Sequence, residues 1–250
     1  MYPFVPPLDK ACKIIEYHPA GLWAIDKADG VLSHPNRKGL NSRCILLCDF
    51  NFNEECYTWS DKEGKSHRLF LLHRLDSATS GIILLSSDRE LAIQVKKSFL
   101  QRKVEKTYFS VVDYKGKPVK PTWKDYLLKK SSDGQLRVIS SKNGSVAITQ
   151  ASLERKKLST LGTLALLKLI PKTGRTHQLR VQSALRKMPI IGDRTYGNFQ
   201  LNRKLAKLSG CQRLFLHAAK IKVQFGLNEK RLNTWEVESP LPHSFEKILA

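Results

Sequence analysis

The chain has 250 residues, with 43 Lys and Arg against 22 Asp and Glu, a formal net charge of +21 and 41% hydrophobic residues. The hydrophobic content excludes a globally disordered chain, and the length allows one large domain or two small ones. The positive charge implies a polyanionic partner, with nucleic acid favoured over an anionic membrane. No run of 18 apolar residues and no basic-then-apolar leader occurs, so we expect neither a membrane-spanning nor a secreted protein.

The N-terminal third is predicted to consist of short strands joined by loops. Two short apolar runs within 12–27, separated by a His-Pro-Ala-Gly turn, indicate a hairpin, and a loop follows over 27–35. The polar stretch 51–67 is predicted to be an irregular surface excursion. Two apolar runs within 69–86 indicate strands on either side of a loop that contains Asp76.

The middle of the chain begins with a helix. Ser87 and Glu90 have the spacing of a capping box, and apolar residues recur at helical spacing over 88–102. Alternating apolar residues predict a strand over 104–112, centred on Tyr108. The stretch 114–145, rich in Lys, Ser and Gly, is predicted to form hairpins and loops.

Further elements follow toward the C-terminus. Strands are predicted at 146–153 and 161–170, and the second is almost wholly apolar, as expected deep in a sheet. A helix is predicted from Thr173 to about Lys187, with Leu179, Ala184 and Leu185 facing inward. A strand region at 214–225 and a short helix at 244–249 complete the chain. Together these elements predict an α+β fold with a large mixed, mostly antiparallel sheet and flanking helices.

The most informative motif is His-Arg-Leu-Asp-Ser-Ala-Thr-Ser-Gly at 73–81. It places the Asp76 carboxylate directly after a basic pair, between two apolar runs, in a loop that closes on glycine. Such a carboxylate can act as nucleophile or base if cations keep it ionised. The alternative is a turn aspartate that caps a strand end, with Ser77, Thr79 and Ser80 helping.

A second motif, Pro-Lys-Thr-Gly-Arg-Thr-His-Gln-Leu-Arg, lies at 171–180. Gly174 permits a tight turn, and Arg175 would sit near a helix N-terminus, where its guanidinium could reach a carboxylate or a phosphate. His177 and Arg180 add hydrogen-bonding groups. An ordinary amphipathic helix with solvated charges is the alternative. A loop with two glycines and an Ile pair follows at 190–197.

Four segments in this order resemble pseudouridine synthases of the RluA type. They are Lys-Ala-Asp-Gly at 27–30 with His34-Pro35, the 73–81 motif, Lys-Thr-Tyr at 106–108, and 173–180 with Gly-Asp and Tyr-Gly at 192–197. The resemblance implies one catalytic domain over 1–250, without an N-terminal S4-type domain. It also implies isomerisation of specific uridines in structured rRNA or tRNA, without metal, nucleotide or other cofactor.

The resemblance also implies residue roles. Asp76 would be buried and paired with Arg175, and would attack the ribose C1′ or the uracil C6 or take a proton from C2′; the sequence leaves these routes open. Tyr108 would stack on the uracil, and its hydroxyl is a candidate for removing the C5 proton. Arg74 would fill the stack that the flipped nucleotide leaves. The other expected substrate contacts are Leu179, which would pack beneath the base, and His73, Thr79, His177 and Arg180.

Two departures from the family pattern concern substrate choice. Ala28 follows the lysine of the first motif, where the family usually has proline, and 51–67 and 114–145 do not align well. A catalytically silent RNA-binding protein on the same scaffold is the alternative function. A metal-dependent nuclease or hydrolase is a third, although no further carboxylate lies near Asp76 in the sequence.

The five cysteines bear on compartment and metal binding. An odd, scattered set without a leader predicts reduced thiols in a cytoplasmic protein. Cys44 and Cys48 would be helical neighbours if 42–50 were a helix, with Cys56 nearby. The ligand set is incomplete for zinc, so we expect buried structural cysteines rather than a metal site. We also expect a monomer.

Overall fold

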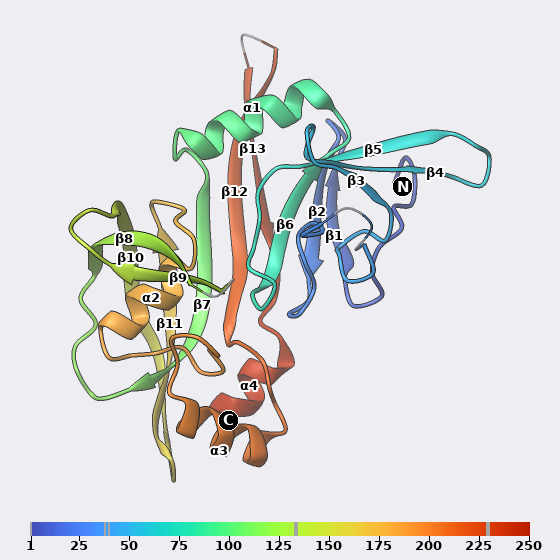
Figure 1. The fold of residues 1–250 in the computed structure, drawn as a ribbon. Helices are drawn as coiled ribbons and strands as arrows, with labels where there is room; N and C mark the ends of the chain where they lie inside the picture. The colour runs from blue at the N-terminus through green and yellow to red at the C-terminus, as the bar shows by residue number, and fades with distance from the viewer. Residues whose placement is uncertain (1, 38, 40, 133–134, 229–230) are drawn as a thin grey trace. The chain divides into compact units, whose positions relative to one another are not determined.

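A computed structural model describes residues 2–37, 39, 41–132, 135–228 and 231–250. The chain forms two compact units. Unit 1 comprises Met1–Val104 and Lys220–Ser239, and unit 2 comprises Glu105–Ala219 and Pro240–Ala250. Strands that pair antiparallel and helices occur in both units, which confirms the predicted α+β class (Figure 1). That the two units together make a single catalytic domain stays a prediction.

Unit 1 is built on antiparallel strands. In its ladder β1 pairs β2, β2 pairs β6, β6 pairs β5, β5 pairs β4 and β4 pairs β3. A further hairpin joins β12, which enters the unit at Lys220, to β13. The strands are β1 (Lys13–His18), β2 (Leu22–Lys27), β3 (Asp49–Asn51), β4 (Cys56–Ser60), β5 (Ser66–Leu71), β6 (Ser80–Ser86), β12 (Leu216–Asn228) and β13 (Arg231–Glu238).

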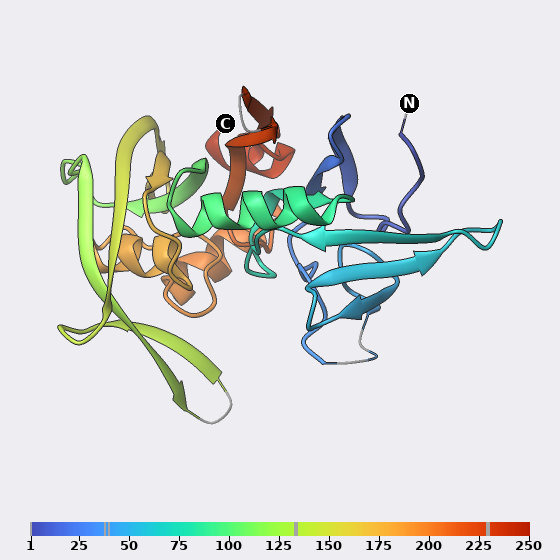
Figure 2. The same cartoon turned by 90° about the horizontal axis from the view of Figure 1, so that it is seen from above.

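The prediction of an irregular excursion over 51–67 is wrong. β3, β4 and β5 form a meander and lie side by side in Figure 2. The fully buried Tyr57 anchors β4, and its hydroxyl donates to the Ser33 carbonyl at 2.8 Å. The polar turns 51–55 and 61–65 conceal these short strands in the sequence, because they dominate the average polarity of the window.

Two apolar clusters make the core of unit 1. One packs β2 and β6 against residues 44–46 and β4, including Trp23, Ile83 and Ile45. The other joins β2 and β6 to the β12–β13 hairpin, and α1 (Arg89–Leu100) adds Leu91 and Val95 to it. Because alternate residues of β2 and β6 point to opposite faces, both faces of these two strands are buried.

The helix predicted at 88–102 is confirmed, with its cap one residue later than the proposed box. Asp88 is the N-cap, and its carboxylate accepts from the Leu91 N–H at 2.7 Å. The Ser87 hydroxyl instead donates to the Gly21 carbonyl. Ser87 therefore ties the preceding turn to the β1–β2 hairpin rather than capping α1.

Unit 2 has the antiparallel strand order β7–β11–β10–β8–β9. The apolar run at 161–170 lies within this order as predicted, and Ala165 and Leu167 are fully buried. The strands are β7 (Glu105–Tyr114), β8 (Thr122–Ser132), β9 (Gln135–Ser140), β10 (Ser145–Ser159) and β11 (Gly162–Pro171). The helices are α2 (Gln178–Leu185), α3 (Phe199–Ser209) and α4 (His243–Leu249).

Two helix predictions in unit 2 need correction. The helix predicted from Thr173 begins at Gln178, because His177 adopts a left-handed backbone conformation with φ 52° and residues 173–176 form a loop. Leu185, predicted to face inward, is 45% exposed. A third difference is α3, which was not predicted although Asn198 caps its N-terminus and Gly210 its C-terminus.

Within the described residues, none of the helices combines the length and the apolar character needed to span a bilayer.

Candidate functional site

The Asp76 loop of unit 1 connects β5 to β6, and both neighbours of Asp76 are fixed. The Leu75 N–H donates to the Ser33 hydroxyl at 3.0 Å, and that hydroxyl donates back to the Leu75 carbonyl at 2.8 Å. On the other side, the Ser77 carbonyl accepts from the Gly30 N–H at 2.8 Å. Asp76 itself is half-buried rather than fully buried as expected. The loop therefore fixes the backbone on both sides of Asp76, while the residue keeps partial access to solvent.

Lys27 stabilises this loop from inside through three hydrogen bonds. Its side chain is fully buried at the end of β2. The ammonium donates to the carbonyls of Ala28 at 2.9 Å, Val31 at 2.7 Å and Ser77 at 2.9 Å. In the sequence, Lys27 belongs to the first motif but has no predicted role. The available signal was a lysine at the end of an apolar run, because an ammonium that is buried there needs several acceptors.

Replacing Lys27 by Met should lower the free energy of unfolding by about 2–3 kcal/mol, because buried carbonyls lose their charged donor. Urea unfolding measures this effect. Lys13→Met, at an exposed lysine of β1, is the control and should change unfolding by less than about 0.5 kcal/mol. Equal stability of the two variants would contradict the role given to Lys27.

The structure brings the first motif and the 73–81 motif together. The Arg74 guanidinium lies 3.1 Å from His34 Nε2, while His34 Nδ1 lies 2.8 Å from the Pro35 carbonyl. A proton on Nδ1 would satisfy that carbonyl and leave Nε2 to accept from Arg74. The His34 ring also stacks on Phe50 at 5.3 Å. Arg74 is exposed at the surface, and its guanidinium is held by the contact with His34.

Two further predicted site residues of unit 1 have structural contacts. His73 Nε2 accepts from the Leu84 N–H at 3.1 Å, and the His73 ring stacks on Phe99. Thr79 is buried, and its N–H donates to the Asp76 carbonyl to close the turn. These contacts fix the loop; a direct contact of either residue with substrate stays a prediction.

In unit 2, Tyr108 lies in β7 opposite Leu169 of β11 and is half-buried, and Leu179 is buried in the first turn of α2. Lys106, two residues before Tyr108, was given no role from the sequence. Its ammonium lies beside Gly174, because a Cβ added there would lie 3.8 Å from Lys106 Nζ. Burial lowers the pKa of this ammonium. Lys106 thus adds a cation next to the loop that carries Arg175.

Arg175 is exposed at one wall of a hollow in unit 2. Its Nε donates to the Val146 carbonyl at 3.1 Å, and its backbone N–H donates to the Gln178 side chain at 3.0 Å. The hollow has a volume of about 380 Å³. Its walls are residues of the β8–β9 hairpin, of the turn before β10 and the first residue of that strand, and of the Arg175 loop: Leu127, Leu128, Lys129, Val138, Asn143, Ser145, Gly174, Arg175 and Thr176.

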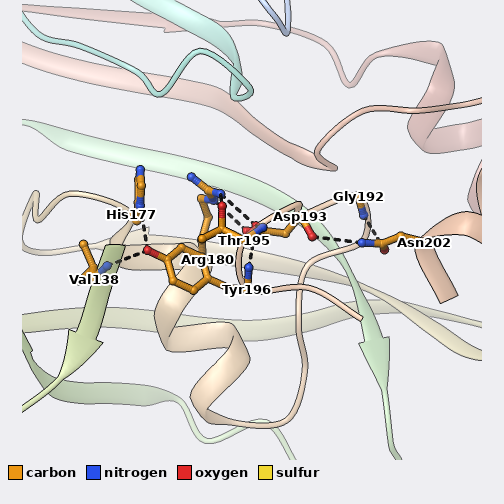
Figure 3. A network of polar contacts seen from close by, with 8 residues as sticks. All are labelled: Val138, His177, Arg180, Gly192, Asp193, Thr195, Tyr196 and Asn202. Carbon is orange, nitrogen blue, oxygen red and sulfur yellow. Dashed lines mark hydrogen bonds and ion pairs between the residues drawn. The ribbon is translucent and has the colours of Figure 1, made fainter. Parts of the chain in front are cut away.

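Arg180 and His177 belong to a network that Figure 3 shows around Asp193 and Tyr196. Arg180 forms a bidentate ion pair with Asp193, with Nε at 2.7 Å and Nη2 at 2.9 Å from carboxylate oxygens. The Tyr196 hydroxyl lies 2.9 Å from His177 Nδ1 and accepts from the Val138 N–H at 2.8 Å. Tyr196 therefore ties β9 to the start of α2.

Gly192, at the start of this network, is required on steric grounds. Its φ is +76°, and a Cβ there would lie 1.7 Å from the Arg213 carbonyl oxygen. Its N–H donates to the Asn202 side chain at 2.8 Å, and that side chain donates to the Asp193 carbonyl at 3.1 Å. α3 therefore helps to position the loop that carries Asp193.

Replacing Tyr196 by Phe should lower the free energy of unfolding by about 1–2 kcal/mol, because the Val138 N–H loses its acceptor beside a buried side chain. Thermal unfolding measures this. Tyr126→Phe removes an exposed hydroxyl from the neighbouring strand β8 and should change the melting temperature little. A Tyr196→Phe variant as stable as Tyr126→Phe would show that the hydroxyl does not hold β9.

The cysteines do not have the geometry that a helix at 42–50 would give. That stretch contains turns and bridges instead. Burial raises the pKa of the Cys12, Cys44, Cys48 and Cys56 thiols, which disfavours the thiolate that a metal or an electrophile needs. In the described ranges, no group of three or more His, Cys, Asp or Glu is arranged to hold a metal ion.

The sequence model of the RNA pseudouridylate synthase family matches residues 21–185. The chain belongs to this family. As a member of the RNA pseudouridylate synthase family, it carries Asp76, Tyr108 and Arg175 inside the matched stretch. Asp76 lies in unit 1, and Tyr108 and Arg175 lie in unit 2, so the pairing of Asp76 with Arg175 stays a prediction.

The names of two curated relatives of this RNA pseudouridylate synthase family member refer to two kinds of RNA. A ribosomal large subunit pseudouridine synthase C of Rickettsia bellii is 34% identical over 181 residues, which are 71% of this chain and 56% of that protein. A tRNA pseudouridine synthase C of Haemophilus ducreyi is 33% identical over 213 residues, 82% of each chain. The chain thus spans just over half the length of the ribosomal relative.

A solved structure agrees with this assignment. Human RNA Pseudouridylate Synthase Domain Containing 4 superposes with a TM-score of 0.65 at 25% identity, covering 94% of this chain and 92% of that one. The fold shared with this member of the RNA pseudouridylate synthase family therefore extends beyond the matched stretch 21–185.

Proposed function

We propose that the protein is an isomerase that converts specific uridines of structured RNA to pseudouridine, with Asp76 as the nucleophile. One observation carries this proposal: inside the family match, Asp76 lies between two residues whose backbones are fixed by Ser33, Lys27 and Gly30. A carboxylate held in this way is suited to attack at one atom of a bound substrate. The net charge of +21 supports an RNA substrate.

The reaction is an isomerisation, so no atom is gained or lost overall. The bond between ribose C1′ and uracil N1 breaks, the base turns, and a bond between C1′ and C5 forms. The proton on C5 must then leave, and N1 takes one up. In this proposal Asp76 acts on C1′, C6 or C2′, Tyr108 stacks on the uracil and its hydroxyl removes the C5 proton, and Arg175 keeps Asp76 ionised.

The substrate contacts follow from the same proposal. Arg74, exposed next to Asp76, takes the place of the flipped nucleotide in the RNA stack. Leu179 packs beneath the base. The two groups of relatives support rRNA and tRNA equally as substrates. The five cysteines are thiols rather than disulfides in the structure, which supports a reducing compartment such as the cytoplasm.

The test is incubation of the purified protein with unmodified tRNA and large-subunit rRNA transcripts, followed by pseudouridine mapping at single-nucleotide resolution. New pseudouridine at one or a few positions in either RNA is expected. RNA binding measured on the same samples identifies the alternative: tight binding without product in both RNAs would favour a silent RNA-binding protein. Product that disappears with a chelator would favour metal-dependent chemistry.

A further inference from the structure

One face of strands β8, β9 and β10 in unit 2 points away from α2. The Gln182 side chain of α2 donates to the Asp125 carboxylate at 2.7 Å and accepts from the Thr149 hydroxyl at 2.6 Å, so these two strand residues face the helix. Because successive side chains of a strand point to opposite faces, Tyr126 points the other way. The register places a set of side chains on this second face, which we call the outer face: Lys124, Tyr126, Leu128, Lys130, Arg137, Ile139, Val146 and Ile148.

The outer face is positively charged. Its cations, Lys124, Lys130 and Arg137, are all exposed. The residues that form it, all within the described part of the chain, include no carboxylate. Lys130 and Arg137 lie directly opposite one another in the β8–β9 ladder. Like charges in such a cross-strand pair destabilise a sheet, so this pair does not help the hairpin to fold. An anion bound between the two side chains would remove the repulsion.

An aromatic ring lies among aliphatic side chains on the same face. Tyr126 is 45% exposed and lies opposite Val146. Leu128 and Ile139 form the next pair of this face, and Ile148 follows Val146 along β10. These four aliphatic residues are half-buried, so they support the ring from the sides without covering it. Unpaired bases of RNA stack on exposed rings of this kind, with little dependence on sequence.

The ring and the cation pair are separated along β8. Tyr126 and Lys130 are four residues apart, which corresponds to about 14 Å in a strand. A base on Tyr126 therefore leaves Lys130 and Arg137 available for a phosphate farther along the same chain. The outer face thus fits a stretch of single-stranded nucleic acid better than one free nucleotide.

The uridine that reacts in the proposed function lies on the opposite face. Tyr108 pairs with Leu169, which pairs with Ala151. Ala151 is two residues after Thr149, so these side chains share the face toward α2. Tyr108 and Tyr126 therefore project from opposite faces of the unit 2 strands, and one base cannot stack on both. A base on Tyr126 is thus a different nucleotide from the one on Tyr108.

We propose that the outer face binds a single-stranded segment of the RNA substrate outside the reacting uridine, with a phosphate between Lys130 and Arg137 and a base on Tyr126. The proposal rests on the proposed function, because it takes the RNA substrate from there. The outer face then contributes to affinity and takes no part in the chemistry. Phosphate contacts and stacking carry little sequence information, so it accepts segments of different sequence.

Lys130→Glu and Lys117→Glu test the charge as a matched pair, because Lys117 is an exposed lysine in the loop between β7 and β8. KM for the RNA substrate should rise about tenfold in Lys130→Glu, with kcat retained, and less than twofold in Lys117→Glu. Thermal unfolding should show Lys130→Glu to be at least as stable as wild type, because the pair with Arg137 becomes attractive. Equal KM values for the two variants, or a destabilised Lys130→Glu, would overturn the proposal.

Tyr126→Ala and Tyr126→Phe test the stacking. The phenylalanine variant keeps the ring and should keep the wild-type KM, whereas the alanine variant should raise KM about tenfold, as expected for one lost stacked base. The same KM in both variants would refute the stacking. If the wild-type protein makes no pseudouridine in any RNA, the proposed function itself fails. Wild-type activity with unaffected Lys130 and Tyr126 variants refutes the outer face alone.

Discussion

Asp76→Asn should reduce pseudouridine formation by about 10⁴-fold, or to the detection limit, as expected when a nucleophile is removed. The amide keeps nearly the same size and shape but cannot attack the ribose or the base. The backbone hydrogen bonds of Leu75 and Ser77, which hold the loop, remain in this variant. Single-turnover assays with excess enzyme measure the rate.

The matched control for this variant is Asp49→Asn, which removes a negative charge from an exposed position in β3 of the same unit. It should retain wild-type turnover. RNA binding by Asp76→Asn should be equal to or tighter than that of wild type, because a carboxylate near phosphates is repulsive. Asp76→Asn turnover within tenfold of wild type would refute the nucleophile assignment while leaving the family assignment unaffected.

Arg180→Met should lower the free energy of unfolding by about 3–5 kcal/mol, because it leaves the buried Asp193 carboxylate without its cation. Because Met keeps much of the aliphatic length of arginine, the loss of stability reflects the missing charge more than a change in packing. Arg155→Met is the matched control. Its partner Glu246 lies at a similar 2.9 Å, but both side chains are exposed, so we expect at most about 1 kcal/mol. Urea unfolding of both variants measures the difference.

The same pair predicts a pH dependence. Burial alone would raise the pKa of Asp193, but the Arg180 guanidinium and the N–H groups of Thr195 and Tyr196 outweigh it and hold the pKa below its ordinary value. A lowered folded-state pKa contributes stability above the unfolded-state pKa, and this stability is lost as pH falls through the folded-state value. Wild type should therefore lose this contribution below about pH 4. Arg180→Met should lack this loss; an identical acid dependence would show that the pair does not set the pKa.

Sequence patterns predicted the elements that have strong periodicity. The β1–β2 hairpin, α1 and the strand around Tyr108 follow from local alternation or helical spacing together with turn residues. The Asp76 loop followed from a polar motif between two apolar runs, because such runs form strands that hold the loop at both ends. Element type is therefore readable where a segment has a regular apolar period or a continuous apolar run between polar turns.

Other features depend on contacts that a sequence window does not contain. The start of α2 is set by the left-handed conformation of His177, whose ring meets the Tyr196 hydroxyl 19 residues later. Arg180 forms a bidentate ion pair with Asp193, 13 residues later, and its predicted contact with substrate stays a prediction. The carbonyls that receive the Lys27 ammonium include one 50 residues away. In each case a distant partner decides the role of the side chain.

The division of unit 1 into two chain segments affects the order in which the protein can fold during synthesis. The cluster that joins β2 and β6 to Ile221, Val223 and Trp235 cannot be completed until the ribosome has passed residue 239, although β2 ends at Lys27. One face of the nascent unit 1 therefore stays uncovered while all of 105–219 is translated. Exposed apolar strands of this kind aggregate readily. Residues 220–239 thus protect the N-terminal strands, and a ribosome stalled after residue 219 would release a chain that needs chaperones.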